Sequence, residues 1–361
     1  MKKLLILSIL TYLLFIINSS AVEVSSSNAV LKNEKILKIG ILLPLSGEHQ
    51  ILGQSFLKAI QLALKDISNK NIIIYPKDTK GNSLTALKAA KEFEKNGIKI
   101  VIGPIFHESL EMLDEIDNIT FISFTNKTID IPKNIIAFGV NIESQMEALK
   151  KYFDEIKVSK TLLLSPKSEF IYQSESVAKK DILKFYRTYS YDANPKKITG
   201  EIKKITKYKE RKKDLERRIK ILEKSDLYKD KKELKKLEQK HTLGKVNFFT
   251  INQWFDETFF SEIAMQNLHF PSIDLKNLES FNKKYFNTYN ETPNKVSILA
   301  YDAIGLIYYC WYNNKHNFKI SQLYNKEGFK GLHGEFIIIN NLSRQKLKVY
   351  KVSKKKFERV Y

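Results

Sequence analysis

The sequence predicts an α/β protein in which parallel sheets are flanked by helices. The main observation is that short apolar runs, typical of buried strands, alternate with segments whose apolar residues recur every three or four positions, as on one face of a helix. The second observation is size, because 361 residues that are 43% hydrophobic and 12% aromatic suffice for two domains with cores of their own. Strands of a parallel sheet are covered on both faces, which explains why the apolar runs are continuous.

The alternation is clearest in the first part of the chain. Strands are predicted over residues 36–43, 72–75, 100–102, 120–123 and 135–138. The helices predicted between them cover residues 53–67, 83–93 and 108–116. Because the carboxyl ends of parallel strands meet at one edge of a sheet, we expect a ligand to bind among the loops that follow these strands.

The same pattern continues in a second lobe. A helix over residues 142–156 is predicted to lead out of the first lobe. Further strands are predicted over 161–164, 335–339 and 346–352, and further helices over 171–186, 275–289 and 295–312. We therefore expect a first lobe made of residues 36–141 and 275–312, which include crossing helices. The second lobe is expected to comprise residues 142–200, 245–274 and 313–361.

Residues 1–21 are predicted to be a cleavable secretory signal peptide. Two lysines precede an apolar run from Leu4 to Ile17, and small residues stand at positions 19 and 21. A membrane anchor is the alternative, but this run spans only about 21 Å as a helix, less than the hydrocarbon core of about 30 Å. No cysteine follows the run, so a lipoprotein is not expected. Residues 22–35 are predicted to be an exposed leader, and the mature chain is expected in the periplasm without stable membrane insertion.

The composition and the motifs argue against several classes of function. Cys310 is the only cysteine, which excludes an intrachain disulfide and a cysteine-based zinc site, and its apolar surroundings indicate a core position. The six histidines show no metal-ligand spacing, so we expect neither a metal site nor a cofactor. There is no nucleophile elbow, P-loop, zinc-protease motif or dinucleotide-binding glycine motif. The sequence therefore does not predict an enzyme.

The positive charge is concentrated in two segments. Of the net charge of +21, residues 196–245 contribute +11 and residues 344–361 contribute +7. Between positions 205 and 222, and again from 234 to 241, apolar or neutral residues recur at helical spacing, which predicts a basic helical hairpin inserted over residues 201–244. Its lysine-rich faces suit either a solvated surface or a contact arm for an anionic or protein partner. Nucleic acid is not expected, because no aromatic residues are interleaved with the basic ones.

A series of motifs gives the most specific signal. The motifs are Lys38–Gly47, Asp78-Thr79, Ile100–Pro104, Phe121–Asn126, Ala300–Ala303 and the glycines at 328, 331 and 334. In their order and spacing they resemble the type I periplasmic solute-binding protein family, the leucine/isoleucine/valine-binding proteins. The resemblance is closest to the branch of penicillin-binding protein activators of α-proteobacteria, because of the fourth strand and the helical arm.

The resemblance implies a two-lobed type I periplasmic binding protein fold and two alternative functions. The first is that of a leucine-binding-protein-like solute-binding protein, which holds an amino acid or a similar small polar ligand between its lobes and presents it to a membrane permease in ABC-type amino-acid transport. The second is that of an interaction protein that activates penicillin-binding proteins in peptidoglycan synthesis without an obligatory ligand.

Candidate ligand-binding residues lie at the predicted strand ends and in one later segment. They are Ser46, Gly47, His107, Thr125, Asn126 and Trp254. Short hydroxyl and amide side chains suit a carboxylate or an ammonium group, and the resemblance implies that the loop containing His107 contacts the ligand. Turn and cap roles explain the serine, threonine and asparagine equally well, and the histidine equally suits the surface at the mouth of the cleft. Trp254 would stack on a ligand or fill a gap, and Asp302 is expected to brace its lobe by a hydrogen bond.

The sequence departs from the family in one segment. Residues 244–254 predict a single short strand, where the resemblance implies at least one further strand–helix–strand passage. We therefore expect a shortened second lobe that either closes around a smaller sheet or clamps its ligand less well.

Overall fold

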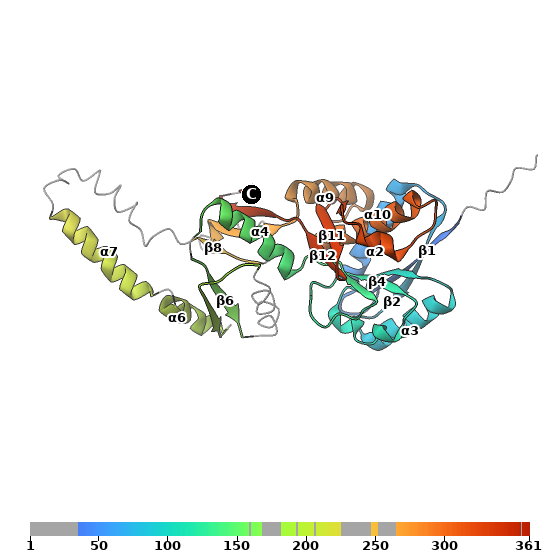
Figure 1. The fold of residues 1–361 in the computed structure, drawn as a ribbon, viewed down its shortest axis with the longest axis horizontal. Helices are drawn as coiled ribbons and strands as arrows, with labels where there is room; N and C mark the ends of the chain where they lie inside the picture. Colours follow the sequence, from blue (N-terminus) through green and yellow to red (C-terminus); the bar gives the residue numbers. More distant parts are fainter. Residues whose placement is uncertain are drawn as a thin grey trace, which may run out of the picture. The chain divides into compact units, whose positions relative to one another are not determined.

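The computed structural model describes residues 35–158, 160–167, 182–192, 194–205, 207–224, 247–251, 265–354 and 356–361 (Figure 1). The predicted signal peptide, the leader up to residue 34, the second helix of the predicted hairpin and Trp254 lie outside the described residues. From Ile36 to Tyr361 the chain forms one compact unit.

An eight-stranded sheet contains the strands predicted for the first lobe. Its order is β10-β11-β12-β5-β4-β3-β1-β2. Five of its strands are parallel to their neighbours as predicted, namely β1 (Leu37–Leu43), β2 (Ile72–Asp78), β3 (Ile100–Ile102), β4 (Thr120–Ser123) and β5 (Ile135–Ala137). The other three are β12 (Leu342–Gln345), which is parallel to β5, and β11 (Glu335–Ile339) and β10 (Phe329–Lys330), which are antiparallel.

The C-terminal strands of this sheet correct one predicted lobe boundary. The assignment of all of residues 313–361 to the second lobe is wrong for residues 329–345, because Leu342 of β12 pairs with Ala137 of β5. The strand is polar in sequence and has no apolar periodicity. Two of its backbone groups are hydrogen-bonded by the N-terminus of a helix from a distant part of the chain, so the residues of the strand alone do not indicate its place in the sheet.

Both faces of the large sheet are covered by helices. Ile39 and Ile41 of β1 pack on one face with α2 (Gln50–Ile67), α9 (Leu275–Tyr289) and α10 (Ile298–Asn313). Leu42 and Val101 pack on the other face with α3 (Ser83–Lys95). Alternate residues of one strand therefore enter two separate cores, which is the burial expected of a parallel sheet.

One predicted helix of the first lobe is replaced by tighter turns. Residues 108–116 do not form an α-helix but two 3-10 segments, η1 (His107–Leu110) and η2 (Leu113–Glu115). The amide of Asn134 donates to the carbonyl oxygens of Leu113 (2.7 Å) and Ile116 (2.9 Å). These carbonyls therefore have partners that do not depend on an α-helix.

Segments from the middle and from the C-terminal end of the chain form two smaller sheets. A four-stranded sheet has the order β14-β13-β9-β8, with β8 (Phe248–Phe249), β9 (Leu268–Ser272), β13 (Lys348–Ser353) and β14 (Lys356–Arg359). A two-stranded parallel sheet consists of β6 (Leu162–Pro166) and β7 (Arg187–Tyr191). The helix α4 (Ile142–Glu155) contacts β9 and β13 of the four-stranded sheet.

Several predictions made from the sequence concern residues 171–186 and 244–254. The strand predicted within residues 244–254 is β8, and it lies parallel to β9. Of the helix predicted over 171–186, residues 171–181 lie outside the described residues, and residues 182–186 are not helical. The predicted shortening of the second lobe rests on residues 244–254, of which 244–246 and 252–254 lie outside the described residues.

Two further helices contain most of the described basic residues of the segment 196–245. They are α6 (Pro195–Ile205) and α7 (Tyr208–Glu223), and the second of these confirms the first helix of the predicted hairpin. The remaining short elements are η6 (Lys295–Ser297) and η7 (Ile320–Tyr324). No helix among the described residues combines the length and the hydrophobicity that a bilayer span requires.

Two predictions for α10 are confirmed. Cys310 is a buried free cysteine, and burial raises the pKa of its thiol to about 11. Asp302 braces the fold, because its carboxylate accepts hydrogen bonds from the backbone N–H groups of Leu332 (2.8 Å) and His333 (2.7 Å). The imidazole Nδ1 of His333 also lies 2.5 Å from this carboxylate.

Candidate functional site

A pocket of about 330 Å³ lies at the carboxyl ends of β3 and β4. Its apolar walls include Phe56 of α2, Phe124, Val140 and Leu299 of α10. Its polar lining consists of His107, Glu108, Thr125 and Asn126. The pocket therefore occupies the edge of the parallel sheet at which ligands of α/β proteins bind.

Two glycines allow the backbone segments around the pocket to approach closely. Gly103 has a φ of +104°, and a Cβ atom there would lie 2.0 Å from the carbonyl oxygen of Leu42. At Gly139 a Cβ atom would lie 2.3 Å from the carbonyl oxygen of Thr125. Side chains at either position would separate the strand ends that form the floor of the pocket.

A serine hydroxyl fixes the two loops that follow β3 and β4. Ser123 Oγ donates to the carbonyl oxygen of Pro104 (2.8 Å) and accepts from the backbone N–H of Thr125 (3.2 Å). Thr125 is buried, and its Oγ1 accepts from the N–H of Lys127 (3.2 Å). Asn126 is exposed, and its side chain has no hydrogen-bond partner within the described part of the chain.

His107 contributes a neutral ring to the pocket. Burial, supported by the positive charge of Lys127, lowers the pKa of His107, although Glu108 and Glu111 act in the opposite direction. Its Nδ1 atom is buried and has no hydrogen-bond partner among the described residues. The lowered pKa favours the neutral form of the ring at pH 7, in which one nitrogen donates and the other accepts hydrogen bonds.

The predicted residues Ser46 and Gly47 do not line this pocket. Ser46 Oγ donates to Asp78 Oδ2 (2.5 Å), and Asp78 Oδ1 accepts from the backbone N–H groups of Leu45 and Lys80 (2.8 Å each). Partial burial raises the pKa of Asp78, but the hydrogen bonds from Ser46, Lys80 and Leu45 outweigh this and bring it below its usual value. The structure thus places the serine hydroxyl in a turn. Gly47 is exposed with a φ of +80°.

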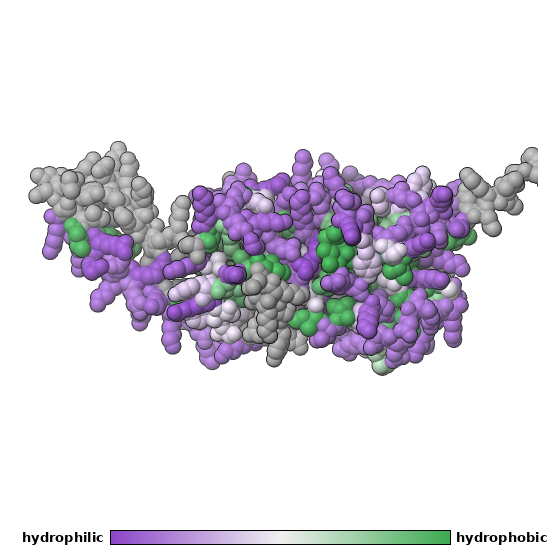
Figure 2. Space-filling model, viewed as in Figure 1, coloured by the Kyte–Doolittle hydropathy of each residue, from purple (hydrophilic) through white to green (hydrophobic). Residues whose placement is uncertain are grey.

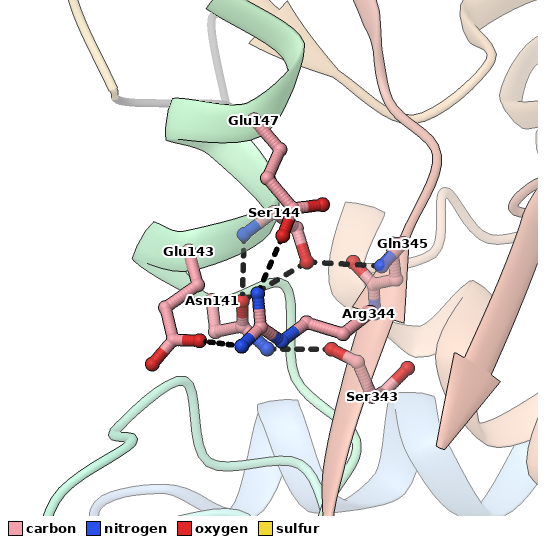
Figure 3. A network of polar contacts seen from close by, with 7 residues as sticks. All are labelled: Asn141, Glu143, Ser144, Glu147, Ser343, Arg344 and Gln345. Atoms are coloured by element: carbon pink, nitrogen blue, oxygen red, sulfur yellow. Dashed lines mark hydrogen bonds and ion pairs between the residues drawn. The ribbon is translucent and has the colours of Figure 1, made fainter. Parts of the chain in front are cut away.

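A second polar cluster joins α4 to β12 (Figure 3). Asn141 caps α4, since its Oδ1 accepts from the backbone N–H and from the hydroxyl of Ser144, both at 2.9 Å. Its Nδ2 donates to the carbonyl oxygen of Ser343 (2.6 Å). The hydroxyl of Ser144 in turn accepts from the backbone N–H of Gln345 (2.9 Å). The side chains at one helix N-terminus therefore bond two backbone groups of a strand about 200 residues later.

Arg344 completes this cluster. Its guanidinium pairs through Nη2 with Glu143 and through Nη1 with Glu147 at 2.5 Å (Figure 3). The side chain of Glu143 is fully buried, whereas that of Arg344 is 22% exposed. Because α4 also packs on the four-stranded sheet, the cluster lies where the chain passes from one sheet to the other.

The apolar walls of the pocket were not predicted as site residues. Phe56 and Leu299 belong to helical stripes that indicate core packing, and both are buried. Val140 follows a predicted strand without any polar signal. Nothing in a local pattern distinguishes a residue that lines a pocket from one that fills a core.

The fold and the position of the pocket are those of the type I periplasmic binding proteins. In agreement, residues 36–186 match the sequence model of the family described as periplasmic binding protein. The resemblance predicted from the motifs is confirmed by this match and by the sheet topology.

Solved structures similar to this chain come from both functional groups implied by the resemblance. One is the C-domain of LpoA from Haemophilus influenzae, described as a regulator of PBP1A (15% identity, TM-score 0.59, covering 90% of this chain and 100% of that one). Another is LivJ from Streptococcus pneumoniae, a branched-chain amino acid transporter substrate-binding protein in complex with isoleucine (17%, TM-score 0.54, 90% and 99%). A third is a putative branched-chain amino acid ABC transporter protein from Rhodospirillum rubrum (13%, TM-score 0.67, 90% and 100%). These likenesses concern the fold. No protein of curated function matches the sequence.

Proposed function

We propose that this protein is a periplasmic solute-binding protein that holds a small amino-acid-like ligand beside His107, Thr125 and Asn126 and presents it to a membrane permease of the ABC type. The observation that carries the proposal is the pocket at the carboxyl ends of β3 and β4, whose walls are apolar and whose few polar groups converge. The predicted signal peptide supports a periplasmic location.

The chemistry of the pocket indicates what the ligand would offer. The neutral His107 ring, the Thr125 hydroxyl and the Asn126 amide provide hydrogen-bonding groups without a positive charge. Glu108 is the charged side chain of the lining and suits an ammonium group. Phe56, Phe124 and the neighbouring aliphatic residues suit an apolar side chain on the ligand.

Thermal unfolding of residues 22–361 against the amino acids and small carboxylates tests this proposal. A ligand at about 100 times its Kd stabilises the folded chain by about 2.7 kcal/mol. For a unit of this size that raises the Tm by about 4 °C. The variant Asn126→Ala is expected to lose the shift, while Asn287→Ala, on an exposed position of α9, keeps it. A folded protein that no compound stabilises would contradict the proposal.

An activator of penicillin-binding proteins is the second candidate. It is favoured by the hydroxyl of Ser46, which is bound by Asp78 rather than directed to the pocket, and by the inserted basic helices α6 and α7. The likeness to the C-domain of LpoA adds support at the level of the fold. The assay is transpeptidase activity of a purified penicillin-binding protein with and without this chain. Stimulation in the absence of any small ligand, retained by Asn126→Ala, would favour this candidate over solute binding.

A further inference from the structure

The helix α7 and the turn after it carry five cations on one face. They are Lys209, Lys213, Arg217, Lys220 and Lys224. Their spacing of four, four, three and four residues places them within a sector of about 80° on an α-helix, along about 22 Å of its length. The acidic residues of α7, at positions 210, 214, 216 and 223, fall outside this sector. We call these five residues the cationic stripe.

Most of the positive charge of the cationic stripe is not paired with acidic side chains of the described residues. All five side chains are exposed. Arg217 pairs with Asp214 at 2.9 Å, and the four lysines have no acidic partner in the part of the chain that the structure describes. Positive charges at i and i+4 repel one another and weaken the helix. An anionic surface along the stripe would relieve this repulsion.

The residue types indicate which anionic surface fits. Protein interfaces are depleted in lysine and enriched in arginine and aromatic residues, because lysine is a strongly hydrated point charge on a flexible stem. Four of the five cations are lysines in an evenly spaced row, which suits the diffuse negative charge of anionic lipid headgroups. Ile221 follows Arg217 by one helical turn, and 61% of its surface is exposed. An exposed aliphatic side chain beside a basic face can enter the headgroup region.

We propose that α7 binds the surface of an anionic lipid bilayer through the cationic stripe, as a peripheral contact without insertion of the helix across the membrane. Figure 2 shows the surface over α6 and α7 as predominantly hydrophilic, with a small hydrophobic area on α7. This inference does not depend on the pocket, so a failed test of lipid binding would not contradict solute binding, and the reverse also holds.

Co-sedimentation with lipid vesicles tests the proposal on residues 22–361, which contain the whole compact unit but lack the apolar run at positions 4–17 that would bind lipid by itself. The vesicles contain phosphatidylethanolamine and phosphatidylglycerol, or phosphatidylcholine alone. We expect binding to the anionic vesicles only, and a steep loss of binding as salt is raised. Changing the five stripe residues to glutamine should lower vesicle binding by more than about a hundred-fold, because each cation near such a surface contributes roughly five-fold and the five contributions multiply.

The matched control removes the same charge elsewhere. Its five substitutions to glutamine are at exposed lysines of other segments, Lys88, Lys95, Lys99, Lys276 and Lys283. This variant should bind like the unmodified chain, and both variants should keep its far-ultraviolet circular dichroism. Equal losses in the two variants would overturn the proposal, because net charge alone would then explain binding. Binding to polyglutamate but not to anionic vesicles would also overturn it, in favour of an acidic protein partner.

Discussion

Arg344 is the residue whose replacement should reveal how firmly β12 is held to α4. The substitution Arg344→Met keeps much of the aliphatic stem but removes the guanidinium from the fully buried carboxylate of Glu143. Breaking a buried ion pair from one side costs about 3–5 kcal/mol. Because Arg344 is itself 22% exposed, we expect the lower end, about 3 kcal/mol. With an unfolding entropy of about 0.7 kcal/mol per degree for this unit, the Tm should fall by about 4 °C.

The assay is thermal unfolding of the single and double variants. In Glu143→Gln/Arg344→Met the buried charge is gone as well, so the double variant should be more stable than Arg344→Met alone, with a coupling of about 1 kcal/mol or more. The control is Lys346→Met, since Lys346 pairs with Glu335 at 2.9 Å but both side chains are more than half exposed. That loss should be much smaller than the loss in Arg344→Met, because solvent screens an exposed ion pair. If the control is as damaging as Arg344→Met, or if the double variant shows no coupling, the buried pair does not stabilise the fold as argued.

Three further perturbations test other parts of the structure by thermal or urea unfolding. Gly103→Ala should destabilise the fold by at least about 3 kcal/mol, because its Cβ would meet the Leu42 carbonyl oxygen. The control Gly200→Ala in α6 has open space around it and should be neutral or stabilising. Similar effects of the two substitutions would refute the close approach of the backbone at Gly103 to Leu42. Asp302→Asn should cost about 2 kcal/mol, since the carboxylate accepts two backbone N–H groups at 2.8 and 2.7 Å, and an unchanged urea midpoint would contradict this. Burial, reinforced by the charge of a nearby lysine, lowers the pKa of His269, so the unfolded chain binds that proton more readily and stability should fall as the pH drops through about 6.5. His269→Gln should flatten this pH dependence, and parallel stability curves would exclude the histidine as its source.

The strands predicted in the first part of the chain are those of the parallel half of the large sheet, and the strands predicted over residues 161–164, 335–339 and 346–352 correspond to β6, β11 and β13. Continuous apolar runs indicate β1, β3, β4 and β5 directly, because almost all residues of these strands are buried. The strand β9 was missed because the fourth of its five residues is Pro271. The strand β8 pairs only with Leu268 and His269 of β9. The side of β9 that faces β8 therefore has no described pairing at Pro271, and a proline is tolerated at such a position.

The strand β12 shows a different limit of sequence reasoning. Ser343 and Gln345 are buried but polar, so no pattern of hydrophobic residues marks the strand. The backbone carbonyl of Ser343 and the backbone N–H of Gln345 are hydrogen-bonded by Asn141 and Ser144, which precede them by about 200 residues. Information of this kind is not local and becomes visible only when the two segments are placed together.

The candidate site was predicted in part. His107, Thr125 and Asn126 lie together in the pocket because they follow neighbouring parallel strands, a relation that strand order alone supplies. Ser46 follows β1, which also belongs to this sheet, but its hydroxyl is bound by Asp78. Competition between a nearby carboxylate and a ligand for the same hydroxyl is a matter of geometry that residue types do not settle.

The pairing of β12 with β5 has a consequence for how the chain is made. During synthesis the strand β5, all of whose residues are buried in the finished protein, has no neighbour on one side until residues 342–345 have emerged. Such an open apolar edge invites pairing with other chains, and long-range pairing of this kind is formed slowly. The nascent polypeptide therefore cannot complete its largest sheet until nearly the whole of it has left the ribosome. The N-terminal sequence predicts export, and a chain with an incomplete sheet stays unfolded enough for longer to pass through a translocation channel. Binding of a chaperone to the unpaired edge of β5 would be an advantage during this delay.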